Sequence, residues 1–376
     1  MPVLPITSEA TLRACRAMAV SRQRDVFVCS YPKSGTTWTQ NIAVRLLWDL
    51  AHRGKSDNSD DDDDGDGNGP QAPLPGDWHL SESAPFYEVD QYWKPGEDPG
   101  SGPMVRLPAE TPILAGTADG DEEEYRVFNT HLLPHQLPAG AKCVYVVRDP
   151  LDVMVSFYHH LSNQAVEDGG YTGSFEDFFE AFLDGTIVYG KWQDHVEAWL
   201  GNRDPDDDYD DDDDDDDAFL LLHYDEMKRD LFGETKRLAR FLFGETDGAD
   251  DDRILDEIVE GVVPHCTFEA MKRERARYTP RTVSWRVRPE TGRPYDAFVR
   301  RGAVGDGRRS LEEETNSSSS SSVSPLLDRW RNHDLPIARA RWTRAGVDPG
   351  IRDKYLGRPD GDGTTAGDDV DDGEPR

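Results

Sequence analysis

Short apolar runs alternate along the chain with longer segments in which apolar residues recur every three or four positions. The apolar runs predict buried strands over residues 25–29, 125–130, 142–147 and 218–222. The longer segments predict helices over residues 41–48, 150–158, 174–179, 189–200, 231–243 and 254–262. Ser8 and Ser174 are expected N-caps, the latter with Asp177 at the third helical position. The alternation predicts an α/β fold, a P-loop-like parallel sheet flanked by helices on both faces.

The 376 residues suffice for one large α/β domain, which we expect over residues 1–358. Polar, low-complexity segments interrupt it at about 54–76, 203–217 and 312–323, and residues 359–376 form an acidic tail. We predict that these segments are disordered, because they carry too little apolar surface to offset the entropy of ordering. The aspartate runs also raise the possibility of calcium binding, but they lack the spaced ligands and turn glycine of a calcium loop.

The chain is strongly acidic, with a net charge of −33. Nineteen of its aspartates lie in the runs 57–66 and 204–217, and the remainder is still acidic. A negative field repels nucleic acid and anionic lipid, so we expect neither as a partner. An anionic cofactor would need local cations at its own site.

The four cysteines are spaced neither as a zinc site nor as a disulfide framework. We expect them to be reduced, which indicates a cytoplasmic protein. Residues 1–12 contain no long apolar segment, and no stretch approaches the roughly 18 apolar residues of a membrane span. We therefore expect neither a secretory leader nor contact with a membrane.

The junction after the first apolar run carries the most specific chemistry. Residues 30–39 read Ser-Tyr-Pro-Lys-Ser-Gly-Thr-Thr-Trp-Thr, between a predicted strand and a predicted helix. The unpaired N–H groups of a helix start, together with hydroxyls and Lys33, make a cradle for a phosphate. The spacing is not that of a Walker A loop, because Lys33 precedes Gly35 by two residues. A plain strand-to-helix turn is the alternative.

Polar residues also follow the next strands. Arg148 comes after the third strand, with Ser156 two turns into the next helix; Arg148 is either a phosphate fork or a partner of Asp152. His131 follows the second strand, at the sheet edge where ligands bind in parallel sheets, and is either a general base or a structural histidine. Arg300 and Arg301 form either a phosphate clamp or a solvated basic turn.

Together these clusters resemble the cytosolic-type sulfotransferases, which use 3′-phosphoadenosine 5′-phosphosulfate (PAPS) as sulfuryl donor. The resemblance runs from about residue 24 to 310, apart from the aspartate-rich insertions. Five motifs occur in family order, at residues 31–38, 148–156, 223–228, 266–272 and 298–306.

The resemblance implies a role for each motif. Lys33 would contact the sulfuryl group and stabilise the leaving phosphate, and His131 would take the proton from the acceptor hydroxyl or amine. The 5′-phosphate would be held by Ser34, Gly35, Thr36 and Thr37. The adenine would be held by Trp38, Tyr224, Thr267 and Phe268. The 3′-phosphate would be held by Arg148, Ser156, Arg300, Arg301 and Gly302. No metal is implied.

The sequence departs from the family pattern at three places. Asn129 replaces a lysine two residues before His131, Cys266 replaces a hydroxyl residue near the adenine, and Gly307 stands where the family usually has tryptophan. No clear dimer motif follows, so the oligomeric state is open.

The predicted activity is transfer of a sulfuryl group from PAPS to a hydroxyl or amine of a small molecule. The alternatives are a P-loop kinase-like phosphotransferase with an unusual loop and a non-catalytic nucleotide-binding protein, since a fold does not guarantee activity. Residues 84–88 and the segment after Tyr278 are expected to line the acceptor pocket.

Overall fold

The computed structural model describes most of the chain outside the acidic segments. The described residues are 2–21, 24–52, 74, 76, 78–93, 114–115, 124–201, 218–244, 249–287, 289, 291–292, 298–317 and 323–358. Of the expected insertions, 203–217 and nearly all of 54–76 lie outside these residues, as does the expected tail from 359 onward.

A single sheet with strand order β2-β3-β1-β4-β5 forms the centre of the fold. Its strands are β1 (Asp25–Ser30), β2 (Leu114–Ala115), β3 (Glu124–Thr130), β4 (Lys142–Val147) and β5 (Phe219–His223). β3, β1, β4 and β5 are parallel, and only the short β2 pairs antiparallel, on β3. The predicted parallel sheet is therefore confirmed, with each long strand within about a residue of its expected bounds.

The central strands are buried on both faces, which explains their continuous apolar sequences. In β1, Val26 and Val28 pack into one apolar cluster, and Phe27 and Cys29 pack into another on the opposite face. All four cysteines are free and buried. Two separate cores thus sandwich the sheet.

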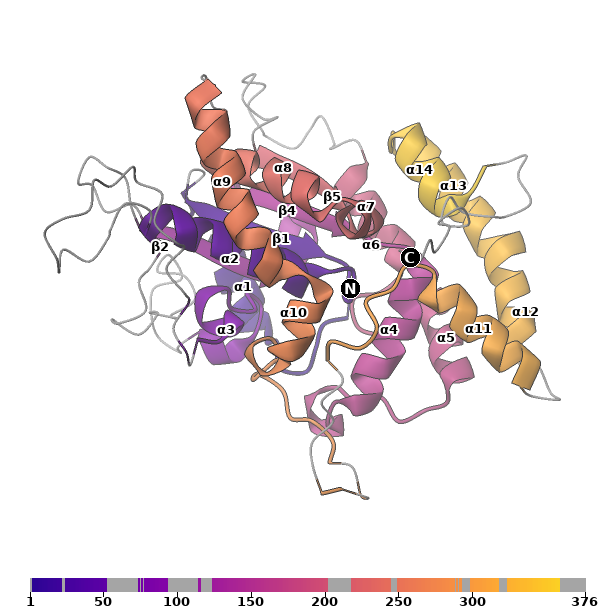
Figure 1. Cartoon of the computed structure of the whole chain (residues 1–376). Helices are drawn as coiled ribbons and strands as arrows, with labels where there is room; N and C mark the ends of the chain where they lie inside the picture. Colours follow the sequence, from indigo (N-terminus) through magenta and orange to yellow (C-terminus); the bar gives the residue numbers. More distant parts are fainter. Residues whose placement is uncertain are drawn as a thin grey trace, which may run out of the picture.

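Helices cover both faces, as predicted (Figure 1). The core with Val26 is built with α2 (Thr36–His52), α8 (Leu231–Phe243) and α9 (Ala249–Cys266). The core with Phe27 is built with α1 (Glu9–Ala17), α4 (Pro150–Asn163), α5 (Phe175–Asp184), α6 (Trp192–Leu200) and α11 (Asp306–Ser317).

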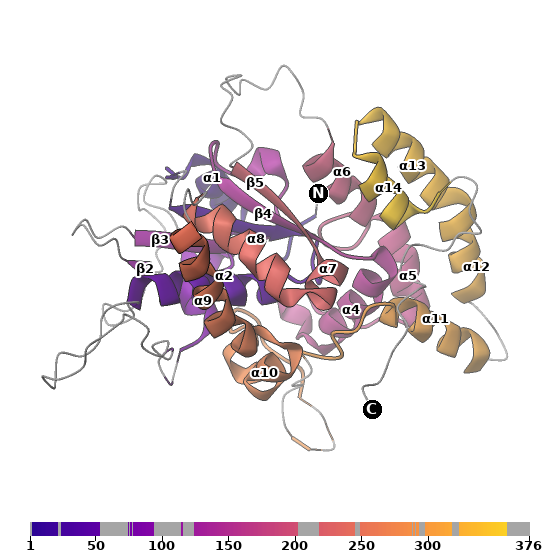
Figure 2. The same cartoon turned by 45° about the horizontal axis from the view of Figure 1, so that its top comes forward.

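Shorter helical segments complete the described structure. They are α3 (Leu80–Ser83), η1 (Asp90–Tyr92), η3 (Pro134–Gln136), η4 (Val166–Asp168), α7 (Tyr224–Arg229), α10 (Phe268–Arg273) and η6 (Arg275–Arg277). At the C-terminal side follow α12 (Val323–Arg329), the π-helical turn η7 (Trp330–Asp334), α13 (Leu335–Arg344) and α14 (Pro349–Leu356). Figures 1 and 2 place α12–α14 on the side of the molecule away from β2.

The helix boundaries test the sequence predictions. Ser8 and Ser174 are the N-caps of α1 and α5, and Asp177 completes the capping box, as predicted. The helix expected from residue 189 begins at Trp192, because Tyr189 adopts a positive φ of 67° that ends any helix there. α11 continues to Ser317, so it takes up the first half of the expected insertion 312–323, while residues 318–322 lie outside the described ranges.

None of the described helices is both long enough and apolar enough to span a membrane.

Candidate functional site

The carboxyl ends of the parallel strands meet at one edge of the sheet, above a cavity of about 210 Å³. β1 leads to the predicted cradle, β3 to His131, β4 to Arg148 and β5 to Tyr224. Thirteen of the predicted residues line the cavity: Lys33, Gly35, Thr36, Thr37, Trp38, His131, Arg148, Ser156, Tyr224, Phe268, Arg300, Arg301 and Gly302. Residues from opposite ends of the chain thus meet at one site.

The two other predicted residues lie beside the cavity. Ser34 is buried in the cradle, and its Oγ has no hydrogen-bond partner. Thr267 is the N-cap of α10, where its hydroxyl accepts the Ala270 N–H at 3.2 Å. Thr267 therefore positions the helix that carries Phe268.

The cradle is a tight turn at the start of α2. Lys33 and Gly35 both have positive φ, 69° and 116°. A Cβ on Gly35 would lie 2.9 Å from Cδ2 of Tyr224, so only glycine allows that ring to approach. A 2.6 Å bond between the Ser30 and Thr36 hydroxyls ties the strand to the helix. The first amides of α2 face the turn without intrahelical partners, as anion binding requires.

Lys33 reaches across the cavity, where its Nζ lies 4.3 Å from the centre of the Phe298 ring. Burial, followed by the charges of Arg148 and Arg300, lowers the pKa of Lys33 to about 7. A clustered set of cations that repel one another is stabilised when an anion enters between them. The position of Lys33 therefore favours an anionic ligand.

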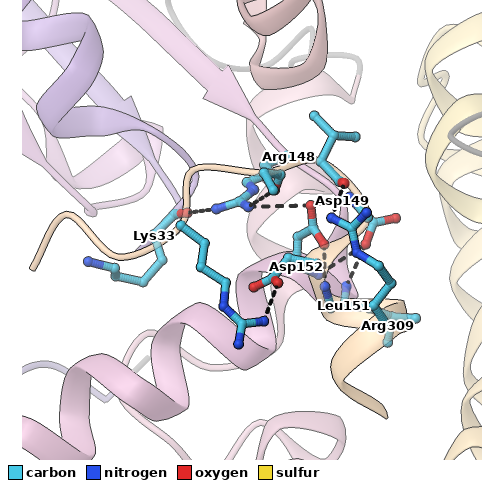
Figure 3. A network of polar contacts seen from close by, with 12 residues as sticks. Lys33, Arg148, Asp149, Leu151, Asp152 and Arg309 are labelled. Atoms are coloured by element: carbon cyan, nitrogen blue, oxygen red, sulfur yellow. Dashed lines mark hydrogen bonds and ion pairs between the residues drawn. The ribbon is translucent and has the colours of Figure 1, made fainter. Parts of the chain in front are cut away.

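Arg148 pairs with Asp152, which is one of the two readings left open by the sequence, and also donates to two backbone oxygens (Figure 3). Its guanidinium donates to Asp152 at 3.3 Å and to the backbone oxygens of Lys33 and Ala303 at 3.3 and 3.0 Å. It also stacks 4.2 Å from the centre of the Tyr224 ring. Its Nε is buried without a partner, so Arg148 keeps a donor for a ligand.

Asp152, which the sequence offered as a partner for Arg148, is a structural hub with two further contacts. Besides Arg148, it accepts the backbone N–H groups of Gly305 and Gly307 at 3.1 and 2.6 Å. These bonds fix the segment after residue 298 on the start of α4. A Cβ on Gly307 would lie 2.3 Å from the backbone carbon of Leu151, so in this chain only glycine allows the two segments to approach so closely.

Arg300 and Arg301 line the cavity and both pair with Asp306, Arg301 at 2.8 Å. The side chain of Arg300 is 23% exposed and that of Arg301 is 54% exposed. The segment that carries Arg300 and Arg301 is therefore partly buried and ion-paired, unlike a fully solvated basic turn. Gly302, at φ 62°, lies against the Phe268 ring. A Cβ at this position would come within 2.3 Å of Cδ2 of Phe268, so only glycine fits here.

Aromatic rings form one end of the cavity. Trp38 donates from Nε1 to the Cys266 carbonyl at 2.6 Å and meets Tyr224 edge-on at 5.5 Å. The ammonium of Lys228 lies 5.9 Å from the Trp38 ring and 5.4 Å from the Phe268 ring. These rings suit a flat, electron-rich base, and the lysine adds positive charge beside it. Lys228 belongs to the motif at residues 223–228, and only the structure shows that its ammonium lies beside these rings.

His131 is held in one tautomer. Its Nδ1 lies 2.8 Å from the Ser30 carbonyl, which can only accept, so Nδ1 carries the proton and Nε2 has a free lone pair. The rings of Phe86 and Tyr189 flank it edge-on at 5.3 and 5.2 Å. Burial lowers the pKa of His131 to about 3, although the bond to Ser30 opposes this. The imidazole is therefore neutral and can take up a proton.

A buried carboxylate behind His131 was also missed. Glu88 accepts the backbone N–H of His131 at 2.9 Å, and the Tyr189 hydroxyl donates to the same oxygen at 3.5 Å. Burial raises the pKa of Glu88 to about 7, although the bond from His131 favours the charged form. No sequence pattern points to this contact, because it depends on the bridge between Phe86 and Asn129.

Asn129 itself lines the cavity, and its buried Oδ1 has no partner. It adds polarity but no charge beside His131. Within the ranges that the structure describes, His, Cys, Asp and Glu side chains form no group of three or more that could hold a metal ion.

Comparisons with known proteins agree on one family. The profile of the sulfotransferase domain matches residues 23–330. The rabbit (Oryctolagus cuniculus) amine sulfotransferase is 30% identical over 301 residues, which cover 78% of this chain and 77% of that protein. The luciferin sulfotransferase of the firefly Photinus pyralis is 28% identical, over 78% of this chain and 69% of that protein.

A solved structure supports the fold. Retinol dehydratase, determined in complex with retinol and PAP, superposes with a TM-score of 0.50 and 22% sequence identity. The match covers 85% of this chain and 86% of that structure.

Proposed function

The chain belongs to the sulfotransferase family, and from this premise we propose that it moves a sulfuryl group from PAPS to a hydroxyl or amine of a small-molecule acceptor. His131 is the general base and Lys33 stabilises the leaving phosphate. One observation carries the proposal: the ends of β1, β3 and β4 bring Lys33, His131 and Arg148 onto a single cavity.

The residues of the cavity fit PAPS, the sulfuryl donor. Two buried polar atoms of the site, Ser34 Oγ and Arg148 Nε, have no partner within the described chain, and a bound phosphate would satisfy both. The rings of Trp38 and Phe268 suit an adenine, and Arg300 and Arg301 bring further positive charge. When bound, PAPS supplies a sulfuryl group activated by its link to the 5′-phosphate.

The chain's own residues then perform three tasks. The neutral Nε2 of His131 accepts the proton of the acceptor nucleophile as that nucleophile attacks. The protonated Lys33 neutralises charge that develops on the leaving oxygen, and the first amides of α2 hold the phosphate in place. The Ser30 carbonyl holds the imidazole, and Glu88 holds the backbone of His131.

Transfer of labelled sulfate from PAPS to a panel of phenols, alcohols, amines and sugars tests the proposal. We expect labelled product from the wild type without added magnesium or ATP. His131→Ala should lower the transfer rate by roughly 10²–10⁴-fold, the usual contribution of general acid–base catalysis. Binding of adenosine 3′,5′-bisphosphate should survive, because His131 contacts the cradle segment only at the Ser30 carbonyl and not at the groups proposed to hold the phosphates.

The matched control is His52→Ala. His52 stacks on Trp48 at 4.0 Å and is not among the residues that line the cavity. Near-wild-type turnover by a folded His131→Ala protein would remove His131 from the role of base. Transfer of phosphate from ATP with a strict need for magnesium, and none from PAPS, would favour the kinase instead.

A further inference from the structure

A second histidine, His160, faces the same cavity from the last turn of α4. It lines both the main cavity and a small adjoining pocket, which it shares with Lys33 and Ser156. Neither the sequence motifs nor the proposed mechanism gives His160 a role.

The position of His160 is fixed by an aromatic cage. Trp285 and Phe298 meet its ring edge-on at 5.3 and 5.8 Å. The segment that carries Trp285 is bonded to the chain just after His160: Ala165 N–H donates to Ser284 at 2.9 Å, and Arg286 N–H donates to Asn163 at 2.8 Å. The imidazole is thus held in place before any ligand binds.

The polar atoms of this imidazole are free for a ligand, since no described residue hydrogen-bonds to the ring. Burial, followed by the charges of Lys33 and His131, keeps the pKa of His160 well below its usual value. A neutral imidazole offers one donor and one acceptor. When a ligand displaces water from this side of the cavity, an imidazole left without partners costs free energy, which favours a ligand that supplies a matching group.

The rest of the acceptor side narrows the class of ligand. The walls around His131 and His160 are mostly apolar, formed by Leu4, Phe86, Phe157, Leu161, Val283 and Phe298. Among the described residues that line the cavity, the only carboxylate is Asp306, which is already paired with Arg300 and Arg301. This side therefore offers no counter-ion for a cationic amine, whereas a neutral ring with hydroxyl groups fits.

His160 also lies close to the reacting centre, because it shares the small pocket with Lys33 and lines the same cavity as His131. The charges of Lys33 and His131 also act on His160, so a ligand whose reacting oxygen lies at His131 can present a neighbouring group to His160. We infer that His160 hydrogen-bonds a second hydroxyl or carbonyl group next to the reacting hydroxyl, so that the enzyme selects neutral aromatic vicinal diols and related hydroxy-carbonyl acceptors. This inference rests on the proposed function.

Paired acceptors test the inference. 2,3-Dihydroxynaphthalene and 2-naphthol share a ring framework and differ by one adjacent hydroxyl. The diol has two equivalent hydroxyls, so its kcat/KM is first divided by two. The corrected value should be roughly 5- to 100-fold above that of 2-naphthol, because only the diol makes the additional buried hydrogen bond to His160. His160→Phe keeps the ring in its cage and should collapse this ratio, while His160→Gln, which can still hydrogen-bond, should restore part of it.

Binding supplies a second readout that needs no turnover. With adenosine 3′,5′-bisphosphate present, calorimetry should show tighter binding of the diol than of 2-naphthol by the wild type and equal binding by His160→Phe. His52→Phe, a histidine change outside the cavity lining, should leave the ratio unchanged.

The outcomes separate the two proposals. The inference would be overturned if the wild type showed equal kcat/KM for 2,3-dihydroxynaphthalene and 2-naphthol. It would also be overturned if His160→Phe left the ratio of these two values unchanged. Either result would leave the proposed sulfuryl transfer intact. Transfer to other members of the acceptor panel with none to the naphthols would do the same. Absence of transfer to every acceptor would overturn both.

Discussion

The lowered pKa of Lys33 predicts that the protein takes up a proton when its donor site fills. Burial and the charges of Arg148 and Arg300 lower this pKa to about 7 in the protein without ligand. Two phosphate groups bound among these cations reverse the balance, because an opposite charge at close range favours the protonated amine. Binding and protonation are therefore linked.

The size of the effect follows from this pKa. At pH 8 a lysine with a pKa of about 7 is about 10% protonated, so binding adenosine 3′,5′-bisphosphate should take up about 0.9 proton. The dissociation constant should accordingly rise about fivefold between pH 7 and pH 8, and nearly tenfold for the next pH unit. The phosphates of the ligand are already ionised at pH 8, so they contribute little.

Titration calorimetry at pH 8 in two buffers of different ionisation enthalpy measures this proton directly. Lys33→Met keeps the length and apolar stem of the side chain but cannot be protonated, so its uptake should be close to zero. Equal enthalpies in the two buffers for the wild type, or an unchanged uptake in Lys33→Met, would refute the assignment of Lys33 to the anion site.

Two further substitutions test the surroundings of the site. Burial raises the pKa of Glu88 to about 7, above its unfolded value, so its favourable contribution to stability is present at low pH and is lost as pH rises. Urea unfolding should therefore show the free energy of unfolding of Glu88→Gln gaining on that of the wild type by about 2.5 kcal/mol between pH 5 and pH 8. If the difference in free energy of unfolding between the two proteins did not change with pH, burial of the Glu88 carboxyl would be contradicted. Gly302→Ala should weaken binding of adenosine 3′,5′-bisphosphate by roughly tenfold or more, because the Cβ of the new alanine would collide with Phe268. Gly305→Ala, with a similar φ of 73° but open space around its Cβ, is the control for backbone strain, and equal losses in both variants would argue against the collision.

The strands could be predicted closely because each is a short apolar run buried on both faces, a pattern that leaves little alternative. The residues of the site could be found for a related reason. In a parallel sheet the residue that follows each strand lies at the same edge, so Lys33, His131 and Arg148 gather although they are far apart in the sequence.

The contacts that hold these residues could not be predicted. Asp152 binds backbone groups of Gly305 and Gly307, and Glu88 binds the backbone of His131, so each contact depends on how distant segments pack. The helices after residue 323 were also not identified. Arginines are interspersed among their apolar residues, and this weakens the apolar pattern on which helix prediction depends. One of them, Arg341, pairs with Asp194 at 2.6 Å, a contact between distant segments.

The central claim is that the strand ends form a site for an adenosine that carries phosphates at both its 3′ and 5′ positions. Calorimetry that compares adenosine 3′,5′-bisphosphate with adenosine 5′-monophosphate tests it most directly. We predict that the bisphosphate binds at least roughly 100-fold more tightly, since charge-assisted hydrogen bonds to Arg148 and its neighbours depend on the 3′-phosphate. Equal affinity for the two nucleotides, or no binding of the bisphosphate, would contradict the account.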